Sequence, residues 1–164
     1  GLFNEQNLKA MDIDKIIVVN GPGSFTGIRI GITIAKVFAW SLNIPITTIS
    51  ALEAMSLSSK TNMLHVPILD ARRGYVFGAI YDQDNSAIFS PKHIKLEELL
   101  QELQDKENYI FITNDVFEGI ENKEPYDPDI EKIVNTFESK EPMNPHAVNP
   151  EYLKLTEAEE SKLN

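Results

Sequence analysis

The feature that most limits the fold is a buried-strand pattern that stops at a glycine-rich turn. Residues 13–19 are mostly apolar and β-branched, which is typical of a strand buried on both faces. The run ends at the sequence Asn-Gly-Pro-Gly at 20–23, after which Ser24 or Thr26 can cap a helix. Because residues 45–55 again read as a strand followed by a helix, the pattern predicts an α/β fold with parallel strands.

Residues 28–42 combine features of a strand and of a helix. Isoleucine alternates with other residues from position 28 to 34, as in a strand, but the apolar segment is long for a strand. Small residues recur at every fourth position, which gives one continuous stripe on a helix and has no meaning in a strand: Gly27, Gly31, Ala35 and Ala39. We therefore predict a helix. The stripe indicates either packing on the protein's own sheet or close approach of a helix from another subunit.

The turn at 21–27 leaves three interpretations open. A glycine-rich loop before a helix offers backbone N–H groups and the positive end of the helix dipole to a phosphate, and the candidate contacts are Gly21, Gly23, Ser24 and Thr26. The spacing does not match a Walker A loop, a dinucleotide fingerprint or a nucleophile elbow. A purely structural turn and a partner-facing loop are the alternatives. Arg29 opposes the helix dipole, which suggests an acidic or phosphate partner or else a solvated side chain.

Residues 1–60 are predicted to form a first α/β lobe and residues 61–164 a second one. Strands are expected over 64–69, 75–81, 86–90 and 109–113, and helices over 96–103, 129–138 and, unless it frays, 157–163. Asp70 precedes Arg72 and Arg73 in the turn before the second of these strands. A catalytic acid with a cation clamp is one interpretation, and a hairpin turn with solvated arginines is the favoured one.

The composition excludes several kinds of site. The formal net charge of −10 argues against direct binding of RNA or of an anionic membrane. The absence of cysteine excludes disulfides, zinc–thiolate sites and thiol nucleophiles. His65, His93 and His146 lack metal-ligand spacing, and no apolar run approaches the roughly 20 residues that span a bilayer. We expect no metal, no cofactor and no membrane partner, and a cytoplasmic location.

Five segments together resemble one known family. They are residues 16–31 (IIVVNGPGSFTGIRIG), 35–36 (AK), 50–54 (SALEA), 66–76 (VPILDARRGYV) and 150–153 (PEYL). The first is similar to the signature of the TsaB family, also called YeaZ, and the others to its continuation, its second-lobe hairpin and its closing motif. The resemblance covers essentially the whole chain.

The resemblance implies an actin-like fold of the ASKHA, ribonuclease H-like type, with two lobes. It also implies a scaffold without catalytic residues, which binds a TsaD-like catalytic subunit and works with a TsaE-like ATPase. That complex transfers threonylcarbamoyl from its adenylate to the adenosine beside the anticodon of ANN-reading tRNAs. The tRNA would be contacted only indirectly. The first-lobe helices would pack on TsaD or on a second copy, so the candidate interface residues are Gly27, Arg29, Gly31, Ala35 and Ala39.

The chain departs from the family pattern at its start. Family members begin with a strand-rich stretch of roughly fifty residues, judged from the domain plan. Because it is missing before Gly1, we expect a truncated first lobe whose first strand has an exposed edge. Two other functions compete with the scaffold: an actin-like phosphotransferase or peptidase, and a nucleotide-sensing module.

Overall fold

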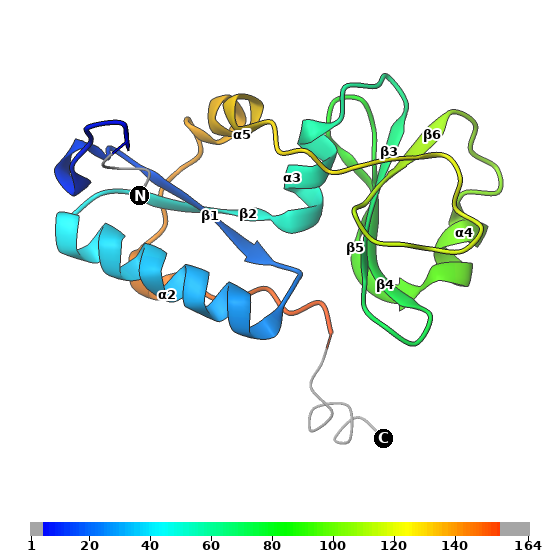
Figure 1. Cartoon of the computed structure of the whole chain (residues 1–164), viewed down its shortest axis with the longest axis horizontal. Coiled ribbons are helices and arrows are strands. Elements are labelled where there is room, and N and C mark those ends of the chain that lie inside the picture. The colour runs from blue at the N-terminus through cyan, green and yellow to red at the C-terminus, as the bar shows by residue number, and fades with distance from the viewer. Residues whose placement is uncertain (1–4, 155–164) are drawn as a thin grey trace.

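The computed structural model describes residues 5–154, which form two α/β lobes (Figure 1). The first lobe is built on a parallel two-stranded sheet, and the second on a five-stranded sheet of order β5-β4-β3-β6-β7. The elements are η1 (Ala10–Asp12), β1 (Ile16–Gly21), α2 (Phe25–Leu42), β2 (Ile46–Ser50), α3 (Ala51–Ser58), β3 (Leu64–Asp70), β4 (Tyr75–Tyr81), β5 (Ala87–Lys95), α4 (Leu96–Glu102), β6 (Tyr109–Ile112), β7 (Lys123–Glu124), α5 (Ile130–Phe137) and η2 (Pro145–Ala147). The predicted α/β class is confirmed.

The first lobe has three layers, with α2 on one face of β1 and β2 and with α3 and α5 on the other (Figure 1). The period of two along β1 explains this arrangement, because Ile16 and Val18 pack toward α2 whereas Ile17 packs toward α3 and α5. Strand β1 pairs in parallel with β2, and no other described strand adjoins it.

The predicted helix at 28–42 is confirmed and is part of α2. Ser24 is its N-cap, because its hydroxyl accepts a hydrogen bond of 3.3 Å from the backbone N–H of Gly27. The helix ends where Asn43 takes the left-handed conformation with φ 54°, a common way to satisfy the last carbonyl groups. A long, well-bounded helix therefore follows the glycine-rich turn.

Helix α3 belongs to both lobes. Ala54 and Leu57 pack with the first lobe, whereas Leu52 and Met55 pack on β4 and β6 of the second. The other face of the second sheet is covered by α4, whose Leu99 is fully buried. Because apolar residues lie on two sides of α3, this short helix joins the two sheets.

The end of the described chain returns to the first lobe (Figure 1). Ile133 and Phe137 of α5 pack against α3 and the first sheet, and Val148 is fully buried beside α2. The Lys15 ammonium donates hydrogen bonds of 2.9, 2.6 and 3.0 Å to the carbonyls of Phe137, Glu138 and Lys140. Packing therefore places residues 130–148 with the first lobe, which differs from the predicted division of the chain at residue 60.

Two strands differ from the sequence predictions. Strand β5 is longer than the predicted 86–90, and the two-residue strand β7 was not predicted. Ser50 is the N-cap of α3, but its hydroxyl makes no capping hydrogen bond. The predicted helix at 157–163 lies outside the described residues.

Candidate functional site: the exposed face of helix α2

The stripe of small residues on α2 is divided between the protein interior and the surface. Ala35 and Ala39 are 8% and 1% exposed and pack in the first-lobe core with Ile46, whereas Gly27 and Gly31 are exposed. The assignment of Ala35 and Ala39 to a partner interface was therefore wrong. The reason is geometric: at 3.6 residues per turn, each step of four residues rotates by about 40°, so the stripe winds around the helix.

The exposed side of α2 carries large apolar side chains instead. Ile30, Ile34, Val37 and Trp40 are 55%, 55%, 56% and 68% exposed. Their spacing of four, three and three residues places them on one face of the helix. The sequence analysis missed this face because the apolar residues surround the helix and only the fold shows which ones the sheet covers. Such a continuous apolar face is typical of an interaction surface.

By length and composition alone, α2 is also apolar enough to cross a membrane, the one such helix in the described part of the chain. This differs from the prediction that no segment approaches that length. In the fold, the helix covers a sheet, with Ile32, Ala35 and Ala39 turned toward the core.

Arg29 contacts two aromatic rings at the start of α2. Its guanidinium lies 4.1 Å from the centre of the Phe25 ring, and its Nε donates a hydrogen bond of 2.8 Å to the hydroxyl of Tyr152. The Phe25 and Tyr152 rings themselves stack with centres 5.3 Å apart. The cation is thus fixed by ring contacts and by one neutral acceptor, which leaves its charge without an anion among residues 5–154.

The glycine-rich turn is partly occupied by the chain's own C-terminal segment. Gly21 is buried and has φ 125°, a conformation that favours glycine, and the backbone N–H of Glu151 donates to the carbonyl of Asn20 at 2.8 Å. The Ser24 hydroxyl is used as the helix cap. Gly23, Ser24 and Thr26 are exposed, and a phosphate contact at this turn stays a prediction.

A groove runs between α2 and residues 145–152. It consists of two hollows of about 420 and 320 Å³ that share Thr33 and Lys36. The first hollow reaches Arg29 and Tyr152, and the second reaches Trp40 and His146. The Lys36 ammonium lies between them and donates hydrogen bonds to the carbonyls of His146 and Val148 at 3.2 and 2.9 Å.

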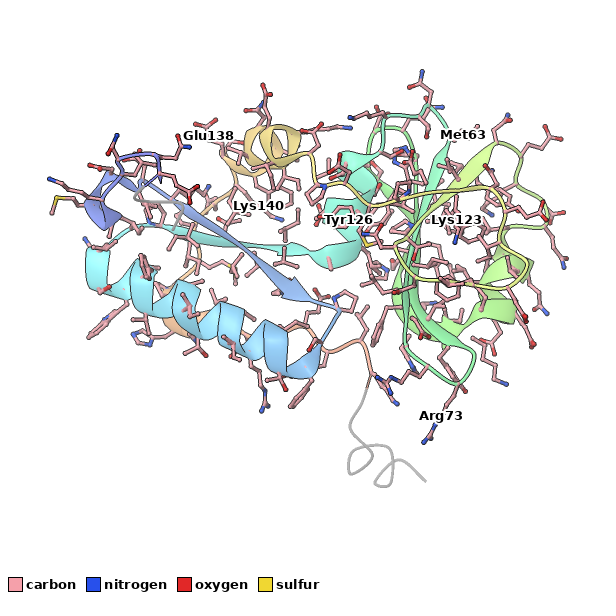
Figure 2. All side chains as sticks on the ribbon, viewed as in Figure 1. Met63, Arg73, Lys123, Tyr126, Glu138 and Lys140 are labelled. Carbon is pink, nitrogen blue, oxygen red and sulfur yellow. The ribbon has the colours of Figure 1, made fainter. Side chains whose placement is uncertain are left out.

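The turn at residues 70–74 is a hairpin, as favoured from the sequence. It joins antiparallel β3 and β4, and the Asp70 carboxylate accepts a hydrogen bond of 2.7 Å from the backbone N–H of Arg72. Arg73 extends away from the ribbon at the hairpin end (Figure 2). Asp70 is therefore used to shape the turn.

The histidines serve different local roles. His65 is buried, with Nδ1 3.1 Å from the Ser56 hydroxyl and Nε2 3.2 Å from the carbonyl of Thr61. His93 stacks on Tyr75 with ring centres 4.7 Å apart. In the described part of the chain, no group of three or more His, Asp or Glu side chains is arranged to hold a metal ion.

Comparisons with known proteins give consistent results. The profile of the family described as TsaD, tRNA N6-adenosine threonylcarbamoyltransferase, matches residues 1–124. The tRNA threonylcarbamoyladenosine biosynthesis protein TsaB of Bacillus subtilis (strain 168) is 32% identical over 176 residues, which cover 96% of this chain and 77% of that protein. TsaB of Escherichia coli (strain K12) is 38% identical over 81 residues, which cover 48% of this chain and 35% of that protein.

Solved structures share the fold. A Pseudomonas aeruginosa protein described as uncharacterized, with similarity to peptidase YeaZ, superposes with a TM-score of 0.74 at 18% identity, covering 93% of this chain and 79% of that one. YeaZ from Pseudomonas aeruginosa gives a TM-score of 0.69 at 16% identity, covering 92% of this chain and 79% of that one. Together with the sequence matches, they confirm the predicted resemblance: the chain belongs to the TsaB (YeaZ) family.

Proposed function

We propose that this chain is a scaffold subunit without catalytic residues, which binds a TsaD-like catalytic protein in threonylcarbamoyladenosine synthesis on tRNA. The transfer would be to the adenosine beside the anticodon of ANN-reading tRNAs, in the cytoplasm and with a TsaE-like ATPase. The relatives named TsaB support the pathway. The observation that carries the binding role is the exposed apolar face of α2.

The α2 face has the properties of a helix-packing surface. Ile30, Ile34 and Val37 project from one side of a helix whose other side is fixed on a sheet. Gly31 has no heavy atom within 4 Å of an ideal Cβ, so a partner's backbone can approach closely beside these side chains. Apolar side chains around a small residue suit a close helix–helix contact. A second copy of the chain is the alternative occupant.

Several groups that such an enzyme could use make structural contacts instead. Asp70 shapes a hairpin turn, the Ser24 hydroxyl caps α2, and the backbone of Glu151 lies against Gly21. These contacts favour the scaffold over an actin-like phosphotransferase or a peptidase.

A matched pair of variants tests the proposal. Ile34→Glu places a charge in the α2 face, and Ile88→Glu makes the same change at a similarly exposed isoleucine of β5, 52% exposed against 55%. By isothermal titration against the TsaD-like protein, we expect Ile34→Glu to weaken binding by at least about 100-fold, because a charge is left desolvated in an apolar contact. Ile88→Glu should bind as the wild type does.

Both variants should melt within a few degrees of the wild type by circular dichroism, because the changed side chains are exposed. Binding by Ile34→Glu at wild-type affinity would show that the α2 face is not the interface.

A further inference from the structure

We infer that the groove between α2 and residues 145–152 receives carboxylates of the partner protein, so that this face selects an acidic partner over a second copy of the chain. This inference rests on the proposed function and adds to it the chemistry of the partner. The occupant is an apolar helix of another protein that carries acidic side chains toward Arg29 and Lys36.

The charged side chains that line the two hollows of the groove are all of one sign. The only charged residues of α2 are Arg29 and Lys36, and residues 142–150 contain no Asp or Glu. This is unusual in a chain with 25 acidic and 15 basic residues. The acidic residues that flank this stretch, Glu141 and Glu151, do not line either hollow, and the charge of Glu151 contributes to raising the pKa of Tyr81 and of Glu53. The groove is thus an apolar and cationic strip on an acidic protein.

Neither cation has an anionic partner in the described part of the chain. Within residues 5–154, Arg29 contacts two aromatic rings and the neutral hydroxyl of Tyr152, which accepts a hydrogen bond from Nε. Lys36 donates to two backbone carbonyls, which orient the ammonium without neutralising it. Since the Arg29 side chain is already fixed by its rings, little rotamer entropy is lost when its terminal nitrogens bind a carboxylate.

The spacing of the two cations predicts the spacing of the carboxylates on the partner. Arg29 and Lys36 are seven residues apart on one helix, so they lie about 10 Å apart along its axis, or two turns. A helix that packs alongside α2 can meet both with two carboxylates on one face, also about two turns apart. Its apolar residues would then contact Ile30, Ile34 and Val37.

A second copy of this chain is a poorer occupant. In a two-fold symmetric dimer the same surface is used twice, so the cations of one copy would face a surface that offers only Arg29 and Lys36. Like charges placed together at an interface cost binding free energy and suppress the wrong partner. The charge pattern therefore favours a heteromeric complex.

Titration at several salt concentrations tests the inference. We compare the wild type with the double variant Arg29→Gln/Lys36→Gln and with Lys95→Gln/Lys132→Gln, which changes the net charge equally at exposed sites on other elements. Wild-type affinity for the TsaD-like protein should fall as NaCl rises from about 0.05 to 0.5 M, since salt screens exposed charges. The groove variant should bind about 10-fold more weakly at low salt and lose most of this dependence, whereas the control variant should keep it.

Self-association, measured by analytical ultracentrifugation, is the second readout. The groove variant should self-associate at least as strongly as the wild type, because the repulsion is removed, while a damaged fold would weaken both interactions. If the groove variant keeps the wild-type affinity and salt dependence while Ile34→Glu abolishes binding, the carboxylate inference is wrong and the scaffold proposal stands. A loss of affinity that is equal at every salt concentration also overturns the inference.

Discussion

The carbonyl oxygen of Glu151 lies 2.7 Å from the position that a Cβ atom on Gly21 would occupy. The two residues are far apart in sequence, and the contact places the C-terminal segment against the turn that leads into α2. The next residue, Tyr152, accepts a hydrogen bond from Arg29. The contact between Gly21 and Glu151 therefore supports both the start of α2 and one end of the groove.

Gly21→Ala should destabilise the protein by more than about 1 kcal/mol, because alanine meets both a positive φ and a backbone oxygen. Urea denaturation gives the change in unfolding free energy. Faster exchange of the Glu151 amide, which donates to Asn20, would show that the segment is released. Gly23→Ala is the control, since its Cβ would make only ordinary contact with Ile28. Equal stability of the two variants would contradict this account.

Gly31→Ala should stabilise the isolated chain by about 0.5–1 kcal/mol, because the position is helical and exposed and the added Cβ meets nothing within 4 Å. The same variant should bind the TsaD-like protein more weakly if a helix lies close to Gly31. Thermal melting and titration measure the two effects separately. A variant that gains stability and keeps its full affinity would place the partner's backbone elsewhere on α2.

Lys15→Met should cost about 1–2 kcal/mol of unfolding free energy. The methionine keeps the apolar stem but removes the ammonium that binds three carbonyls at the end of α5. Lys132→Met, at an exposed position of the same helix, is the control and should change stability by less than about 0.5 kcal/mol. Chemical denaturation of the two variants, followed by circular dichroism, compares them directly.

The stability of the fold should depend on the ionisation of Glu53. Burial raises the pKa of this carboxyl above its ordinary value of 4.5; Lys140 and a backbone hydrogen bond at Ser50 oppose the shift, and Glu151 adds to it. The folded state therefore binds this proton more tightly than the unfolded state. The contribution of Glu53 to unfolding free energy should fall as pH rises from 4.5 through the raised pKa.

Glu53→Gln removes this pH dependence and should be more stable than the wild type at neutral pH. Urea denaturation between about pH 4.5 and pH 7.5 measures the difference between the two proteins, which should widen as pH rises. Glu121→Gln, at an exposed loop position, should follow the wild-type curve. A constant difference between Glu53→Gln and the wild type across this range would contradict the assignment.

Local sequence patterns predicted most of the elements because the patterns are themselves local. The β-branched run before Gly21 and the capping hydroxyl of Ser24 define β1 and the start of α2. The periodicity of residues 96–103 likewise predicted α4. In contrast, β7 at Lys123–Glu124 carries no strand pattern of its own and exists because β6 offers it an edge.

The candidate site was predicted only in part, because its boundaries depend on what covers α2. The sequence showed small residues along the helix, but whether Ala39 faces a sheet or a partner depends on β2 and on Val148, over a hundred residues away. The sequence predicted that Arg29 lies at the start of the helix but not what it contacts, because its hydrogen-bond partner Tyr152 is distant in sequence. Non-local packing therefore decided which side of α2 is the surface.

The packing of residues 130–148 on the first lobe also determines the order in which the two lobes can fold during synthesis. Strands β3 to β7 form from one continuous stretch, so the second lobe can fold as soon as that stretch has left the ribosome. The first lobe waits for α5 and Val148, and the contact of Lys15 with Phe137 spans 122 positions. Helix α2 therefore reaches its final packing only after residues 130–148 have been synthesised, so the surface that would meet a partner forms later than the second lobe.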